Sequence, residues 1–259
     1  MNKVFGYLEL DGNVYKITSI DELNDFVYRL GSEFKELNDC EFAELCSFKE
    51  SDGETYCDDC GVIYSKDGKK LLFMSMDSEE YKIKEGTAII GNEAFRWNIY
   101  FNGYNYIYNA KREIHVKEIS MPDSIIAIGN DSFSNNTWLM TLKSSSNLKY
   151  IGERAFLGCT NLLKFDWPSA LRYIGANAFE HCAGFTEVLL NNGVKNIGSH
   201  AFKNCVNLVV VSLPSTIEAF GSGVFDGCNK LTEIRIPKGC SDKFSRLLPF
   251  SKDMFVEIE

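Results

Sequence analysis

The chain has 259 residues, of which 45% are apolar and 24% charged, and its formal net charge is −9. This is the composition of an ordinary globular protein, with material for one large core or a long repeat array. The acidic balance disfavours nucleic acid and anionic membrane surfaces as partners, because both require clustered Lys and Arg. No apolar run approaches the ~18 residues of a membrane span, so no span is expected.

The N-terminal stretch predicts a β-hairpin and not an export signal. Residues Val4 to Leu10 and Val14 to Ile17 are strand-like, and Asp11-Gly12 between them is a turn pair. Acidic residues interrupt the apolar run before the core of a signal peptide forms. If the chain is native from Met1, the expected location is the cytoplasm. If a signal has been trimmed, the alternative is the cell surface or secretion.

Two helices are expected after the hairpin. Ser19-x-x-Glu22 is a capping box that opens a helix with one apolar face, and Gly31 ends it. A second helix is expected over Ser32 to Phe48. Because no repeat is found here, residues 1–56 are predicted to form a small α+β cap, of the kind that a repeat array needs at its open end.

A C-x-x-C motif follows the predicted cap. It consists of Cys57 and Cys60, with Cys40 and Cys46 upstream. A structural zinc site needs two such pairs at suitable spacing, and a redox motif needs a strand-to-helix context that is not found here. We therefore expect no metal and no cofactor. A metal or redox function of this Cys-containing region stays open as an alternative.

From this point a phrase of the form I-G-x-x-A-F recurs along the chain. Its last five glycines are each 23 residues apart, which is the signature of a solenoid. Each unit ends in a short strand of the form L-x-x-I-x-I with one buried face. The repeated glycine predicts a conformation or a close approach closed to side chains, and the repeated Phe predicts a continuous spine. The glycines are Gly91, Gly129, Gly152, Gly175, Gly198 and Gly221.

The full unit, I-G-x-x-A-F-x-x-C-x-x-L-x-x-I-x-I-P, resembles the BspA-like class of leucine-rich repeats over residues from about 61 to 259. The resemblance implies an α/β-type curved solenoid with a parallel concave β-sheet and short irregular or helical convex segments. It also implies a bacterial or protist protein of recognition or adhesion without catalytic activity. On this basis residues 57–240 are expected to form the leucine-rich repeat solenoid, and no enzyme is expected.

One long insert breaks the period. The step from Gly91 to Gly129 is 38 residues, which places 15 extra residues at about 96–112. The first interpretation is a hairpin around Asn102-Gly103 that packs its aromatic residues on the flank of the solenoid. The alternative is a binding loop, because insertions in repeat proteins lie on one face. Its candidate contact residues are Trp97, Tyr100, Tyr104 and Tyr106.

Four cysteines and two of the three histidines also follow the repeat. A row of cysteines spaced by about 4.8 Å cannot converge on a tetrahedral ion, so buried reduced thiols are expected and not a metal site. His181 and His200 occupy variable slots, which predicts exposed positions and no general base. No catalytic motif is found, so no catalytic residue is proposed. The cysteines are Cys159, Cys182, Cys205 and Cys228.

The last residues predict a closing cap over 241–259. Ser241 to Leu248 is expected to form a short amphipathic helix, and Met254 to Ile258 a last strand. Such a segment would cover the core that the final coil leaves open.

The concave strands carry the candidate recognition surface. Residues that flank the buried Ile of each strand point to this face, where apolar residues lie in the middle and charged residues around them. We expect a protein partner of unknown identity and a monomeric chain. The alternative is that single exposed apolar residues carry no meaning. The candidate residues are Met140, Lys143, Leu163, Lys164, Asp166, Glu187, Leu189, Val209, Val210, Glu233 and Arg235.

Overall fold

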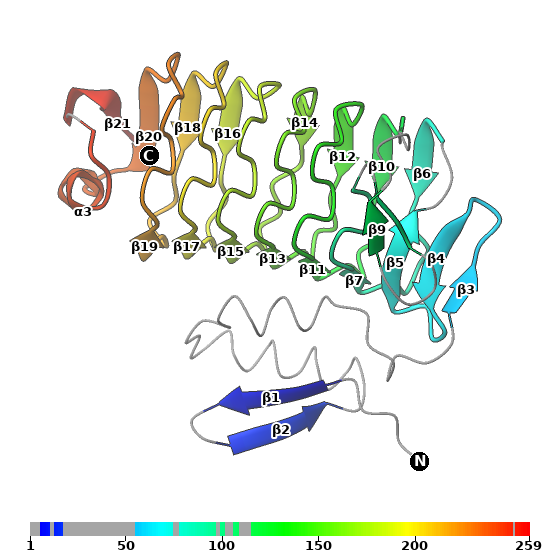
Figure 1. Cartoon of the computed structure of the whole chain (residues 1–259). Helices are drawn as coiled ribbons and strands as arrows, with labels where there is room; N and C mark the ends of the chain where they lie inside the picture. Colours follow the sequence, from blue (N-terminus) through cyan, green and yellow to red (C-terminus); the bar gives the residue numbers. More distant parts are fainter. Residues whose placement is uncertain are drawn as a thin grey trace.

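The computed structural model describes residues 6–10, 13–17, 55–74, 78–96, 99–101, 106–108, 115–250 and 252–259. The part from residue 115 onwards, with 78–96, forms a parallel β-solenoid of about seven coils (Figure 1). The two predicted helices of the N-terminal cap, and Cys40, Cys46, Trp97 and Tyr104, lie outside the described residues. No helix in the described part of the chain is long and apolar enough to cross a membrane.

One row of strands, here named the front ladder, is formed by the L-x-x-I-x-I segments. Neighbouring strands pair in parallel, in the orders β14-β12-β10-β6 and β16-β18-β20-β21. The strands are β6 (Glu80–Lys82), β10 (Glu118–Ser120), β12 (Thr141–Lys143), β14 (Lys164–Phe165), β16 (Glu187–Leu189), β18 (Val210–Ser212) and β20 (Glu233–Pro237).

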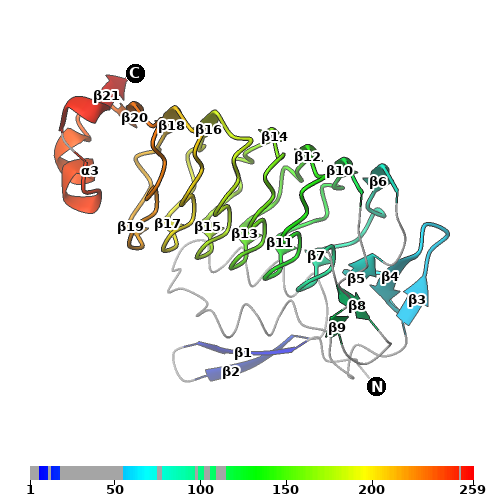
Figure 2. The ribbon, with the colours of Figure 1, turned by 45° about the horizontal axis from the view of Figure 1, so that its top comes forward.

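A second row, here named the back ladder, is formed by the residues just before each repeated glycine. It runs along the opposite edge of the coils (Figure 2) and joins six two-residue strands to a three-stranded antiparallel segment in one nine-stranded sheet. The strands are β3 (Thr55–Cys57), β4 (Val62–Ser65), β5 (Lys70–Met74), β7 (Ile89–Ile90), β11 (Ala127–Ile128), β13 (Tyr150–Ile151), β15 (Tyr173–Ile174), β17 (Asn196–Ile197) and β19 (Ala219–Phe220).

The segments between the two ladders are turns with little helix. The sequence interpretation allowed irregular or helical segments there, and the second parallel sheet was not foreseen. The reason is the length of each strand: two residues carry no period that could distinguish a strand from a turn. Among the described residues, α3 (Ser241–Leu247) is the one α-helix.

The repeated glycine is required by the distance between coils. A Cβ built on Gly175 would lie 2.5 Å from the carbonyl carbon of Gly152, and one on Gly221 would lie 2.1 Å from the backbone nitrogen of Ser199. Neither glycine has a positive φ. The close approach that the sequence predicted is therefore present, and an unusual backbone conformation is not involved.

The predicted phenylalanine spine runs through the core. Phe133 and Phe156 stack with ring centroids 4.9 Å apart, and Phe156 and Phe179 follow at 5.0 Å. All of these rings are fully buried. The separation widens to 5.7 Å between Phe202 and Phe225 at the C-terminal end.

Two left-handed residues per coil reverse the chain between the ladders. The slot two residues after the spine Phe has positive φ at Asn135, Gly158, His181, Asn204 and Gly227. The slot two residues after the repeated Gly has it at Glu93, Asp131, Arg154, Asn177, His200 and Gly223. The two histidines are thus turn residues. The His181 side chain is 56% exposed as predicted, but His200 is half-buried, because the turn of the next coil covers it.

Three smaller segments complete the described chain. At the C-terminus α3, a 3-10 turn (Lys252–Met254) and β21 (Phe255–Ile258) follow the last coil, and β21 pairs in parallel with β20. At the N-terminus β1 (Gly6–Leu10) pairs antiparallel with β2 (Asn13–Ile17). In the insert, β8 (Ile99–Phe101) and β9 (Tyr106–Tyr108) pair antiparallel, as a hairpin does.

Candidate functional site

The front ladder presents alternate residues outward. The central residue of each strand is at most 6% exposed, from Tyr81 in β6 to Ile234 in β20. Its neighbours on both sides are exposed or half-buried. This is the pleat of a strand with one buried face, so the eight candidates that flank a central residue lie on the outer surface of the front ladder. Met140, Leu163 and Val209 directly precede their strands and are exposed as well. Of the insert candidates, Tyr100 and Tyr106 lie in β8 and β9.

The apolar candidates form two groups on this surface. Met140 and Leu163 belong to neighbouring coils, since the Leu163 N–H donates to the Met140 carbonyl oxygen at 2.9 Å, and their exposures are 41% and 59%. Leu189, Val209 and Val210 form the second group, in which Leu189 and Val209 are 40% and 37% exposed. The sequence prediction treated all five as one centre.

The two groups are separated because the front ladder is interrupted between β14 and β16. Figure 1 shows the wider space between these two strands. Large aromatic side chains occupy the coil at this point. Trp167 packs on Phe165 at 4.6 Å and on Phe179 at 5.2 Å, and Phe185 lies 6.0 Å from Trp167. In the other coils the slots of Trp167 and Phe185 hold smaller side chains without a ring, such as Leu213 and Leu208, and neighbouring strands pair there.

Some of the charged candidates already form an ion pair within the chain, and others do not. Lys143 is bonded to Glu118, and this bond raises the pKa of the exposed Lys143 ammonium. Arg235 Nε lies 2.6 Å from Glu233 Oε1 on the same strand. By contrast, within the described residues no ion pair involves the remaining exposed candidates. These are Lys164, Asp166 and Glu187, which flank the interruption of the ladder.

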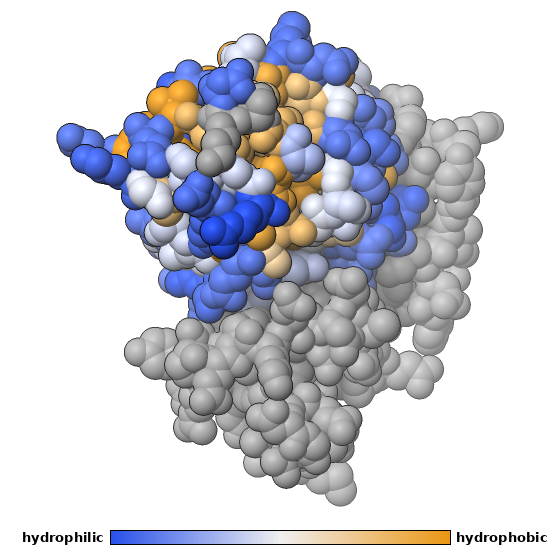
Figure 3. All heavy atoms as spheres, turned by 90° about the vertical axis from the view of Figure 1, so that its left-hand side faces the viewer, coloured by the Kyte–Doolittle hydropathy of each residue, from blue (hydrophilic) through white to orange (hydrophobic). Residues whose placement is uncertain are grey.

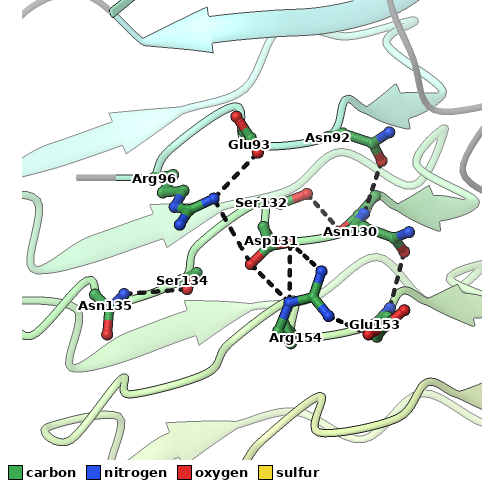
Figure 4. A network of polar contacts seen from close by, with 11 residues as sticks. Asn92, Glu93, Arg96, Asn130, Asp131, Ser132, Ser134, Asn135, Glu153 and Arg154 are labelled. Carbon is green, nitrogen blue, oxygen red and sulfur yellow. Dashed lines mark hydrogen bonds and ion pairs between the residues drawn. The ribbon is translucent and has the colours of Figure 1, made fainter. Parts of the chain in front are cut away.

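A polar cluster that the sequence reasoning missed lies beside the back ladder (Figure 4). Arg154 Nη2 donates to Asp131 Oδ2 at 2.9 Å, and Arg154 Nε lies 3.2 Å from both carboxylate oxygens. Asp131 is only 7% exposed, and Arg96 approaches it from the preceding coil at 3.9 Å. Burial raises the pKa of Glu93 in the same cluster. The missed signal was opposite charge in the same slot of two successive coils.

The four ladder cysteines are free buried thiols that bond the backbone. Cys182 Sγ donates to the Phe156 carbonyl oxygen at 3.2 Å, and the other three bond the spine Phe of the preceding coil in the same way. Asn136 takes this slot one coil earlier and donates to Phe95. Burial raises the pKa of the Cys159 and Cys182 thiols, which keeps both protonated and unreactive.

The C-x-x-C motif forms a turn closed by its own carboxylate. Asp58 Oδ1 accepts the N–H of Cys60 at 3.0 Å and of Val62 at 2.8 Å, and Asp58 Oδ2 accepts the Tyr81 hydroxyl at 2.8 Å. Cys57 and Cys60 are exposed free thiols. In the part of the chain that the structure describes, no group of three or more His, Cys, Asp or Glu side chains is placed to hold a metal ion.

The comparisons with known proteins agree with this architecture. Residues 104–232 match the BspA type Leucine rich repeat region in six copies. A leucine-rich repeat protein of T. pallidum is 22% identical with a TM-score of 0.56, over 73% of this chain and 84% of that one. A leucine rich cell surface protein from Faecalibacterium prausnitzii is 20% identical with a TM-score of 0.50, over 77% of this chain and 43% of that one.

A further solved structure, a leucine-rich repeat protein from Eubacterium ventriosum, is 24% identical with a TM-score of 0.50, over 69% of this chain and 51% of that one. The chain therefore spans about half or less of the last two proteins. No curated protein matches it. These likenesses show the fold, and proteins with such repeats are typically non-catalytic. By its repeats and its coils, the chain belongs to the BspA-type leucine-rich repeat family.

Proposed function

We propose that this protein is a non-catalytic recognition module that binds a protein partner on the outer surface of the front ladder. The observation that carries the proposal is the exposure of Met140, Leu163, Leu189 and Val209 along the front ladder, at 37% to 59%. Exposed apolar residues gathered on one face, with charged residues around them, are how many protein interfaces are built.

The interruption of the ladder gives this surface its shape. Leu163 and Leu189 lie on either side of it, and both are exposed. The uncompensated charges of Lys164 and Glu187 flank the same place. A partner that buries both leucines would form charge-assisted contacts at the edge of its footprint. We therefore place the centre of the interface at β14, β16 and β18.

The test compares two variants in affinity purification from the native cell. Leu189→Glu together with Val210→Glu puts two charges into the proposed centre. Val206→Glu is the matched control, because Val206 is 42% exposed but lies on a turn outside the strands. Proteins retained by the wild type and by the control, and lost with the double variant, support the proposal. Equal retention by all three would contradict the site.

A second candidate is an exported cell-surface adhesin. The observation that favours it is the Faecalibacterium prausnitzii neighbour, which is a cell surface protein. The discriminating measurement is protease treatment of intact native cells, with detection of the protein by antibody. Degradation without lysis supports surface exposure, and protection until lysis supports the intracellular module.

A further inference from the structure

Each inner coil binds the next one through the N–H groups of three alternate turn residues. In the coil around Phe179, these donors are the left-handed residue after the repeated Gly, the spine Phe, and the left-handed residue after it. The bonds are Asn177 N–H to Ser199 at 2.9 Å, Phe179 N–H to Ala201 at 2.7 Å and His181 N–H to Lys203 at 2.9 Å. The acceptors are alternate main-chain carbonyl oxygens of the next coil.

The last coil has the same three donors and no further coil. They are the N–H groups of Gly223, Phe225 and Gly227, and none of them has a hydrogen-bond partner in the described part of the chain. Phe225 is 5% exposed, so its unpaired N–H lies in a largely buried residue. An unmet backbone donor in such a place is costly and favours an acceptor.

A pocket of about 380 Å³ is lined by the first two of these donor residues, Gly223 and Phe225, and ends one residue before Gly227. One wall is the last coil, from Phe220 to Asp226, and the other is the cap segment from Leu247 to Phe250. Figure 3 shows this end of the molecule, with apolar atoms in its middle and hydrophilic residues around them. The volume is at the lower end of the range of ligand sites, and suits a short stretch of peptide.

The charge at the pocket indicates which side chain the occupant carries. In the inner coil, Glu180 follows Phe179 and pairs with Lys203 of the next coil, Nζ to Oε1 at 3.3 Å. Asp226 follows Phe225 in the same slot and forms no ion pair within the described residues. A row of N–H donors alone would also suit a carboxylate. The Asp226 carboxylate would repel a bound carboxylate. The site therefore favours an occupant that offers neutral carbonyl oxygens and a nearby cation.

We propose that the C-terminal end of the solenoid binds an extended peptide segment of a partner protein, which carries a Lys or Arg and lies on the last coil as a further coil would. The carbonyl oxygens of alternate residues accept the N–H groups of Gly223, Phe225 and Gly227. The cationic side chain pairs with Asp226. This site is separate from the front ladder and independent of the proposed function.

The test uses a peptide that copies residues 198–204, Gly-Ser-His-Ala-Phe-Lys-Asn, with acetyl and amide ends. It is titrated into the ¹⁵N-labelled full chain, and the amide resonances are followed. We expect saturable shifts of the Gly223, Phe225 and Gly227 amides. Asp226→Asn should weaken binding by about two- to fivefold, the range of an exposed ion pair. A peptide with Glu in place of Lys should bind the wild type more weakly than the Lys peptide does. The Asp226→Asn variant should not show this loss of affinity.

Three results would overturn the proposal. The first is the absence of shifts at these three amides at millimolar peptide, and the second is equal shifts with the Lys and Glu peptides. The third is a wild-type dimer in sedimentation whose dissociation on dilution exposes the same three amides, because a second copy would then be the occupant. An amide spectrum of Asp226→Asn that matches the wild type elsewhere verifies that this variant is folded.

Discussion

The two ladders of the solenoid are built by the same repeat, yet one is continuous and the other is not. The back ladder joins β19 to β3 without interruption, whereas the front ladder separates between β14 and β16. In five coils the back ladder depends on a glycine whose added Cβ would lie within 3 Å of the backbone of the neighbouring coil. The front ladder depends on the size of inward side chains, which varies. Direct backbone contact between coils therefore restricts which residue a position can hold more strictly than contact between packed side chains does.

The spine between the ladders should give the largest effect. Phe179→Ala removes a fully buried ring that stacks at 5.0 Å on Phe156 and 5.3 Å on Phe202. We expect a loss of about 3–5 kcal/mol in the free energy of unfolding, from lost transfer energy and the cavity left behind. Urea denaturation followed by circular dichroism measures it. A loss below about 1 kcal/mol would mean that the neighbouring coils close the cavity.

The back ladder is tested by adding one methyl group. Gly175→Ala places a Cβ 2.5 Å from the backbone of the preceding coil, and the two coils must then separate. We expect destabilisation of about 3 kcal/mol, the upper end of overpacking. The matched control is Gly239→Ala, where a Cβ meets no atom within 4 Å but φ is +80°. This control should lower the free energy of unfolding by about 1 kcal/mol, because of its backbone conformation alone. Equal losses would show that crowding is not the cause.

The sequence predicted the elements that repeat and missed those that depend on neighbouring coils. The period alone located the spine Phe, the crowded Gly and the buried residue of each strand. It did not show the interruption of the front ladder, because Trp167 and Phe185 fit the apolar pattern and only their combined volume matters. Nor did it show the Asp131–Arg154 pair, which becomes visible only when equal slots of successive coils are compared.

The interruption of the front ladder should be measurable by amide hydrogen exchange. In the slot before the strand, the Leu163 N–H bonds Met140 at 2.9 Å and the Val209 N–H bonds Thr186 at 2.8 Å, but the Thr186 N–H has no equivalent bond in the described structure. We expect the Thr186 amide to exchange about tenfold faster or more, the equivalent of one hydrogen bond.

A smaller side chain should restore the ladder at this point. Trp167→Leu removes the ring that packs between the two coils, so that Thr186 can approach Leu163. The Thr186 amide should then exchange at a rate near that of Val209. If Trp167→Leu leaves the difference unchanged, the aromatic volume is not what holds the strands apart.

The smallest expected effect lies at the turn beside the back ladder. Burial raises the pKa of Glu93, and the nearby Asp131 carboxylate acts in the same direction, although Arg96 opposes both. A carboxyl whose folded pKa is raised stabilises the fold below its ordinary pKa and loses that contribution as the pH rises through the folded pKa. Glu93→Gln removes this loss and keeps an acceptor for the Arg96 guanidinium, which lies 3.1 Å from Glu93 Oε1.

We therefore expect Glu93→Gln to equal the wild type at pH 4 and to exceed it at pH 7, by less than about 0.5 kcal/mol, the usual range for such substitutions. Urea denaturation at the two pH values measures the difference. A variant less stable than the wild type at pH 7 would show that the attraction of Arg96 exceeds the cost of burial. In that case the ionised Glu93 would stabilise the turn beside the back ladder. The back ladder would then depend on a charged side chain as well as on backbone contacts, and would differ less from the front ladder.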